Sequence, residues 1–177
     1  VYIVPTADFH ESEYVGAHFK ARSYITGFTG SAGTAIITMT EAGLWTDARY
    51  FLQAKHQLEN TGVTLYRMGE EGVPTIMEYL RSALPEGGTL GFDGRVINAR
   101  LGAEFLALAG EKNAKLAVGE DLVGISWDDR PELPHAPVRI LTAEYSGRST
   151  ADKLADVRAE MEKQGASVHL LTSLYDI

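Results

Sequence analysis

Short runs of β-branched and aromatic residues alternate with amphipathic segments along most of this chain, and this alternation restricts the fold more than any other feature. The strand-like runs are residues 1–4, 63–66, 89–92 and 116–118, and the segments with apolar residues at helical spacing are 48–58, 74–84 and 99–109. Strands that alternate with helices in this way favour a mostly parallel sheet covered by helices. The pattern therefore predicts an α/β fold.

One pair of runs is too close together for a crossover helix. Residues 35–39 and 44–46 are separated only by residues 40–43, a spacing typical of a β-hairpin with a short loop. Strands joined by a hairpin are antiparallel. We therefore expect a mixed, mostly parallel sheet flanked by helices.

Capping residues mark the predicted helices. Asp47 and Asn98 stand where a helix N-cap is expected, and Pro74 stands at a first helical position, where proline is favoured. Pro85 and Gly110 are expected to end two of these helices.

A proline-rich stretch divides the chain. Prolines at 131, 134 and 137 rule out a helix or a central strand, so the region near 128–138 is predicted to be an extended linker. Beyond it, a capping box at Ser149 begins a predicted helix over 150–164, and a strand is predicted over 167–172. We expect one domain over 1–146 and the truncated start of a second, similar domain over 147–177.

Charge and residue types exclude several functions. Sixteen Lys and Arg against 24 Asp and Glu give a net charge of −8, which repels nucleic-acid phosphates and anionic lipid. No apolar run approaches the ~20 residues that span a bilayer. We therefore expect neither a nucleic-acid nor a membrane partner. The chain has no cysteine, which fits a reducing compartment.

The titratable residues form no familiar catalytic pattern. No H-E-x-x-H or G-x-S-x-G motif is present, and the five histidines are scattered. His10, beside Glu11 and Glu13, is interpreted as part of a solvated loop. We predict no metal ligand and no catalytic residue in this chain.

The glycine-rich run 27–34 has two interpretations. A phosphate-binding loop follows a strand, ends in Gly-Lys-Ser/Thr and opens a helix, whereas this run lacks the lysine and leads into a strand. We favour a tight turn with close backbone approach, anchored by Phe28.

Arg49 stands at a position where a positively charged side chain is unfavourable. It lies in the first turn of a predicted helix, where the helix dipole disfavours a cation. Either it pairs with Asp47 or a neighbouring carboxylate, or it serves a function outside the helix.

Several of these segments, taken in order, resemble a known family. Tyr2–Pro5 with Asp8, Ser12–Tyr14, Arg22–Ala35 and Leu44–Ala54 resemble the N-terminal, creatinase-like domain of the Xaa-Pro aminopeptidases (aminopeptidase P). The later stretches 127–131 and 153–177 resemble the approach to the second domain of these enzymes and its first helix and strand. The resemblance spans nearly the whole chain.

The resemblance implies a cytoplasmic-type, three-domain metallopeptidase in which two N-terminal domains of similar fold precede a pita-bread catalytic domain. The catalytic domain carries two divalent metals, usually manganese, and removes the N-terminal residue from peptides with proline in the second position. Its Asp, His and Glu ligands are not in this sequence. The chain is therefore expected to be a fragment cut at both ends, inactive alone and without a bound cofactor.

The resemblance also implies a site residue and partners. In related enzymes the arginine of a Trp-Thr-Asp-Gly-Arg-Tyr-Phe motif contacts the bound peptide, and the matching residue is Arg49, although this chain has Ala48 in place of the usual glycine. The expected partners are a peptide with proline second, the missing catalytic domain and a second copy of the chain.

Two alternatives remain open: the N-terminal domain of a prolidase-like or creatinase-like hydrolase, and a stand-alone binding or assembly module. A further hypothesis concerns the apolar stripe of helix 150–164. We expect this stripe to pack where a helix preceding Val1 would lie, in the same chain or in a neighbouring copy.

Overall fold

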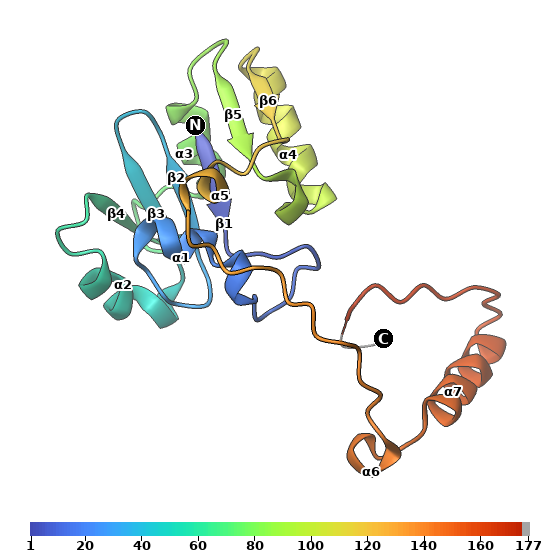
Figure 1. Cartoon of the computed structure of the whole chain (residues 1–177). Coiled ribbons are helices and arrows are strands. Elements are labelled where there is room, and N and C mark those ends of the chain that lie inside the picture. The colour runs from blue at the N-terminus through green and yellow to red at the C-terminus, as the bar shows by residue number, and fades with distance from the viewer. Residues whose placement is uncertain (175–177) are drawn as a thin grey trace. The chain divides into compact units, whose positions relative to one another are not determined.

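The computed structural model describes residues 1–174, which fall into two compact units, Val1–Glu132 and the part from Leu133 onward (Figure 1). The first unit contains a six-stranded sheet and helices on both of its faces. Its strands are β1 (Tyr2–Pro5), β2 (Thr34–Ile37), β3 (Ala42–Thr46), β4 (Val63–Arg67), β5 (Thr89–Phe92) and β6 (Lys115–Ala117). Its helices are η1 (Ala17–Phe19), α1 (Ala21–Thr26), η2 (Ala48–Tyr50), α2 (Phe51–Gln57), α3 (Ile76–Ala83), η3 (Gly94–Val96), α4 (Ala99–Glu111) and α5 (Leu122–Ser126).

The sheet has the order β4-β3-β2-β1-β5-β6. Strand β2 is antiparallel to both neighbours, and the pairings β3–β4, β1–β5 and β5–β6 are parallel. The predicted mixed, mostly parallel sheet is confirmed. All strands except β2 therefore run in one direction, and their carboxyl ends meet at one edge of the sheet, where α/β proteins commonly bind ligands.

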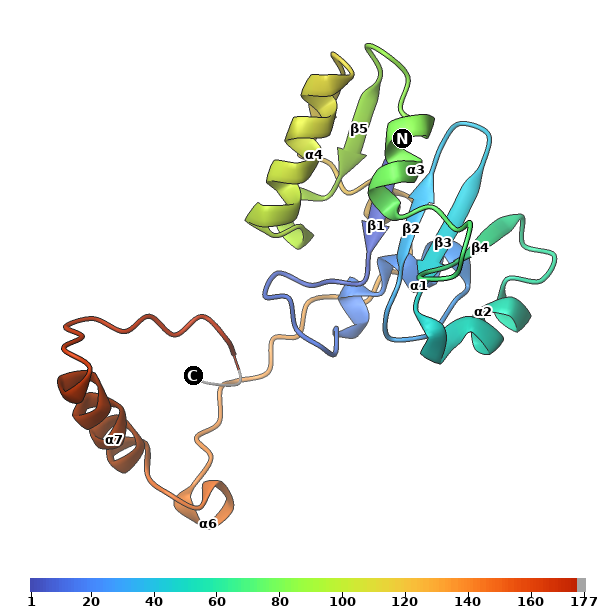
Figure 2. The same ribbon diagram turned by 180° about the vertical axis from the view of Figure 1, so that it is seen from behind.

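Consecutive residues of a strand supply the two cores, because their side chains point to opposite faces. Ile3 and Trp45 pack with α3 and α4 on one face. Their neighbours Val4 and Leu44 pack on the other face, where α1, α2 and α5 lie (Figure 1), whereas Figure 2 shows the face covered by α3 and α4. The central strands are thus covered on both faces. The loops that follow these strands are therefore accessible only at the edges of the sheet.

The predicted hairpin and helices are confirmed, with shifted ends. The hairpin joins β2 to β3 through residues 38–41. Pro74 is not the first helical residue: helix α3 begins at Ile76, because Thr75 caps it and forms a capping box with Glu78. Gly110 does not stop α4, which continues to Glu111.

The second unit contains α6 (Ala143–Ser146) and α7 (Thr150–Lys163), which Ser149 caps as predicted. Residues 130–142 form neither helix nor strand. The predicted strand 167–172 is not formed, since these residues have no strand beside them within residues 1–174. The predicted domain boundary after residue 146 stays a prediction. None of the helices in this described part is long and apolar enough to cross a bilayer.

Candidate functional site

The segment that follows β3 is positioned by its own side chains. Trp45 is fully buried, and its indole N–H donates to the Pro74 carbonyl at 2.9 Å. Thr46, also fully buried, donates its hydroxyl to the Ala32 carbonyl at 2.7 Å. The end of β3 is therefore held against both the segment before α3 and the glycine-rich loop, and it delivers the next residues to the carboxyl edge of the sheet.

Arg49 forms a two-point ion pair with Asp47. Its Nε donates to Oδ1 and its Nη2 to Oδ2, each at 2.8 Å, while its backbone N–H also donates to Oδ1 at 3.1 Å. The guanidinium hydrogen bonds lower the pKa of Asp47 and raise that of Arg49. Local pairing of Arg49 with Asp47, one of the two sequence interpretations, is thus confirmed. The other interpretation, peptide contact by Arg49, is not tested by this pairing and stays a prediction.

The pairing leaves Arg49 open to a ligand. Its side chain is 69% exposed, and only two of its five N–H donors are used by Asp47. The remaining three have no hydrogen-bond acceptor within residues 1–174. Arg49 is a guanidinium held in one direction with free donors, which suits it to bind a carbonyl or a carboxylate.

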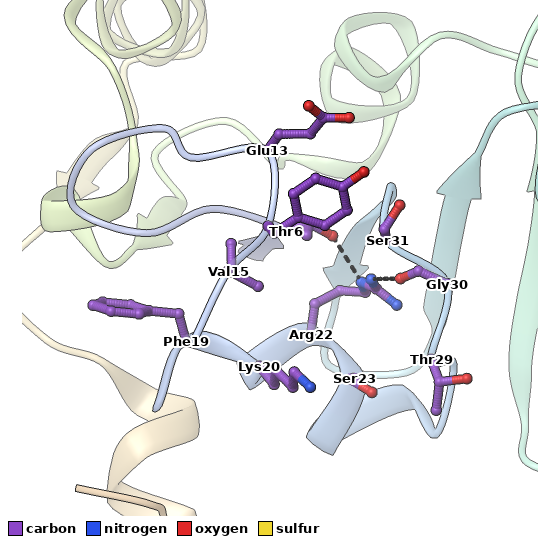
Figure 3. Close-up of a pocket in the computed structure, with 11 residues that line it drawn as sticks. Thr6, Glu13, Val15, Phe19, Lys20, Arg22, Ser23, Thr29, Gly30 and Ser31 are labelled. Atoms are coloured by element: carbon purple, nitrogen blue, oxygen red, sulfur yellow. Dashed lines mark hydrogen bonds between the residues drawn. The ribbon is translucent and has the colours of Figure 1, made fainter. Parts of the chain in front are cut away.

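A hollow of about 340 Å³ is lined by the glycine-rich loop and by the segment that contains Glu13 and Arg22 (Figure 3), and Arg49 is linked to this lining through Tyr50. Ser31 lines it and shares a 2.6 Å hydrogen bond with the hydroxyl of Tyr50, whose ring the Arg49 guanidinium overlies at 5.3 Å. Glu13, which also lines the hollow, is close enough to act electrostatically on Arg49. The lining residues are Thr6, Glu13, Tyr14, Val15, Phe19, Lys20, Arg22, Ser23, Thr29, Gly30 and Ser31.

The glycine-rich loop forms one wall of this hollow as a close-packed turn. Phe28 is fully buried, and a Cβ on Gly30 would lie 2.2 Å from its ring. The carbonyls of both residues accept hydrogen bonds from the buried Arg22 guanidinium. A phosphate loop presents N–H groups instead, so the tight-turn interpretation is confirmed. Sequence reasoning missed Arg22, and the only signal was an arginine five residues before the first glycine of the run.

A second turn repeats the Asp47–Arg49 geometry at the end of β5. Asp93 caps η3, and the Nε and Nη2 of Arg95 donate to its two carboxylate oxygens, each at 2.9 Å. Sequence reasoning missed this pair, although Asp-x-Arg directly after a strand occurs at both places. The repetition shows that the geometry alone does not single out Arg49.

The carboxylates of Asp8 and Glu11, in the acidic loop before α1, accept hydrogen bonds from other residues. Backbone N–H groups of His10 and Ser12 donate to Asp8, and the Glu11 carboxylate accepts a hydrogen bond from the Asn98 side chain. Within the part of the chain that the structure describes, no three His, Asp or Glu side chains gather as metal ligands do.

Comparison with known proteins decides the family. The family model described as Creatinase/Prolidase N-terminal domain matches residues 14–123, and a second model with the same description matches residues 129–177. The chain belongs to the creatinase/prolidase N-terminal domain family. This membership agrees with the resemblance seen in the sequence and with the observed mixed sheet.

Relatives of this family member are aminopeptidases. The chain is 39% identical to aminopeptidase P2 of Arabidopsis thaliana over 99% of its own length, and 37% identical to Xaa-Pro aminopeptidase 2 of Homo sapiens over 92%. Its fold matches X-prolyl aminopeptidase of Caenorhabditis elegans, described as a cytosolic enzyme with a di-nuclear active site, with a TM-score of 0.80 and 30% identity over 93% of the chain. The chain spans only 24 to 27% of the length of these three proteins.

Proposed function

We propose that this creatinase/prolidase N-terminal domain is the non-catalytic N-terminal part of a metal-dependent Xaa-Pro aminopeptidase. The relatives support this assignment because they are Xaa-Pro aminopeptidases that match nearly the whole chain. The two divalent metals, taken to be manganese, belong to a catalytic domain beyond this sequence. The protein acts in the cytoplasm, as the cytosolic relative does.

Arg49 is the residue through which this part contacts the substrate. The role rests on the match of Arg49 to the peptide-contacting arginine of the family motif, and the exposed guanidinium, fixed by Asp47 at two points and left with free donors, suits it to that contact. Such a group binds a peptide carbonyl without losing much side-chain entropy, because Asp47 has already restricted its rotamers. It positions the peptide and takes no part in bond cleavage.

The test uses the full-length gene product with added manganese and a peptide whose second residue is proline. We expect hydrolysis by the full-length protein and none by the 177-residue chain. Arg49→Ala should lower kcat/KM by about tenfold, since loss of one charge-assisted hydrogen bond of ~1.5 kcal/mol corresponds to this factor. The stability of the variant should not change measurably.

The matched control is Arg95→Ala, which removes the same two-point ion pair from the turn after β5. Its hydrolysis rate should equal that of the parent protein. Equal activity of Arg49→Ala and the parent would contradict the role of Arg49, whereas absence of any Xaa-Pro hydrolysis would contradict the proposed enzyme.

A further inference from the structure

The guanidinium of Arg22 is a buried cation whose hydrogen-bond partners are all neutral. Its Nε donates to Thr6 Oγ1 at 3.0 Å, its Nη1 to the Phe28 carbonyl at 2.5 Å, and its Nη2 to the Gly30 carbonyl. Arg22 is only 3% exposed, and within residues 1–174 no carboxylate lies at ion-pair distance from it. Burial lowers the pKa of Arg22 to about 10, which still leaves it charged at neutral pH.

An unpaired buried charge is costly, and its neighbours here do not supply a counter-ion. The carbonyls of Phe28 and Gly30 and the ring of Phe28, 4.7 Å from the guanidinium, offset part of this cost. They cannot neutralise the charge. Because Arg22 lines the hollow, an anion bound there could do so.

The rest of the lining suits an anion. Lys20 is exposed on the rim and pairs with no carboxylate of the described chain. Ser23, Thr29 and Ser31 contribute hydroxyl groups. The one acidic residue of the lining, Glu13, lies away from Lys20, at the other end of the hollow (Figure 3). The lining therefore has two cations and one anion in a chain whose net charge is −8.

We propose that this hollow binds a carboxylate of the peptide substrate, with Lys20 and the buried Arg22 supplying the positive charge. The inference rests on the proposed function, because it takes the ligand to be the peptide that Arg49 contacts. The carboxylate is the C-terminus of a short peptide or an acidic side chain of a longer one. A hollow of about 340 Å³ has the size of a small ligand site, not of a protein interface.

The first experiment measures binding to the 177-residue chain itself, which contains the whole lining. A tripeptide with proline second is titrated as the free acid and as its C-terminal carboxamide, at low salt, while backbone amide NMR signals are followed. The free acid should bind about tenfold more tightly than the carboxamide, because charge-assisted hydrogen bonds to a desolvated cation exceed an exposed ion pair in strength. The signals of Lys20, Gly30 and Ser31 should shift.

The variant Lys20→Met tests the location of the carboxylate site and leaves the buried hydrogen bonds of Arg22 in place. It should reduce the preference for the free acid by about threefold to fivefold, as expected for an exposed cation. Lys55→Met removes an exposed lysine on α2 that does not line the hollow, and it should leave the preference unchanged. Equal binding of acid and carboxamide, or an effect of Lys55→Met as large as that of Lys20→Met, would overturn the proposal.

A third peptide separates the two sources of the carboxylate. This peptide is a C-terminal carboxamide with aspartate at its third position. If the site accepts a side-chain carboxylate, the peptide should bind as tightly as the free acid. If the site binds only a C-terminal carboxylate, the peptide should bind as weakly as the plain carboxamide. Either result supports the site. If both acidic peptides bind without shifting the signals of Gly30 and Ser31, the proposed site is wrong.

Hydrolysis by the full-length protein distinguishes this inference from the proposed function. Hydrolysis that depends on Arg49 but shows no preference between acid and carboxamide would overturn the carboxylate site alone. Carboxylate binding that depends on Lys20, in a full-length protein that hydrolyses no Xaa-Pro peptide, would overturn the proposed function alone.

Discussion

Asp47 caps the turn that carries Arg49 and binds the guanidinium of Arg49 at two points, with both side-chain hydrogen bonds at 2.8 Å. The direction of the arginine is thus tied to the backbone at the end of β3. An exposed ion pair of this kind contributes only ~0 to 1 kcal/mol to stability. Its main consequence is the orientation of Arg49.

Asp47→Asn separates orientation from stability. The asparagine oxygen can still cap the turn, whereas the charge that holds the guanidinium is lost. The free energy of unfolding should change by less than about 1 kcal/mol, while kcat/KM of the full-length protein on an Xaa-Pro peptide should fall about tenfold, because misplacement of a positioning group is costly. Urea unfolding and steady-state hydrolysis measure the two effects. Asp93→Asn, the same change after β5, should leave hydrolysis intact, and equal losses in both variants would refute this account.

Gly30→Ala should destabilise the first unit. The added Cβ would lie 2.2 Å from the Phe28 ring and 2.8 Å from that of Tyr50, an overlap that costs about 1 to 3 kcal/mol where the core cannot move. Gly110→Ala is the matched control, since Gly110 lies inside α4 and, apart from its chain neighbours and the backbone of its own helix, no atom lies within 4 Å of the new Cβ. There alanine should stabilise by up to about 1 kcal/mol. Urea unfolding of both variants decides the matter, and a neutral Gly30→Ala would show that the loop can open.

Periodicity predicted the longer helices, whose buried residues are apolar, but not the five-residue α5. Helix α1 was missed because its buried residues are Arg22 and Thr26, which a hydrophobic pattern treats as exposed. The run 167–172 was predicted as a strand from its composition, yet Val168 and Leu170 are 82% and 79% exposed. A strand needs a partner for its backbone groups, and composition does not supply one.

The candidate site was predictable only in part for a similar reason. Arg49 could be singled out because a cation is unfavourable in the first turn of a helix, and its partner Asp47 is only two residues away. The contacts that make up the hollow join residues far apart in sequence: Arg22 with Thr6, and Ser31 with Tyr50. No spacing rule relates such positions, so the fold had to be known first.

The apolar stripe of α7 gives a prediction about assembly. Within its own unit this helix buries no residue, and Leu154 and Val157 stay 40% and 38% exposed. If the stripe packs on the first unit or on a second copy, removal of residues 150–177 should lower the melting temperature or the oligomeric state. Melting curves and sedimentation at several concentrations test this, with Leu154→Ser/Val157→Ser as a variant of full length. Unchanged values in both variants would refute the hypothesis.

The environment of Asp121 lets us predict how the stability of the first unit depends on pH. Its side chain is 13% exposed, binds Arg130, and accepts a hydrogen bond from the Gly124 N–H at 2.8 Å. Burial alone would raise the pKa of Asp121, but Arg130 and this N–H outweigh it and hold the pKa below its ordinary value. A carboxyl whose pKa is lower in the folded state stabilises fully above its unfolded pKa of ~4, and the contribution is lost as pH falls through the folded pKa.

Asp121→Asn should therefore cost about 1 to 3 kcal/mol at pH 7, where the parent protein has the full contribution of the ion pair. The difference between parent and variant should shrink as the pH falls below ~4, because protonation removes the same charge from the parent. Urea unfolding between pH 7 and pH 3 measures the two curves. Asp129→Asn, which changes an exposed aspartate nearby, should run parallel to the parent throughout. A parallel course for Asp121→Asn as well would mean that Asp121 has the same pKa in the folded and unfolded chain, contrary to its contacts with Arg130 and Gly124.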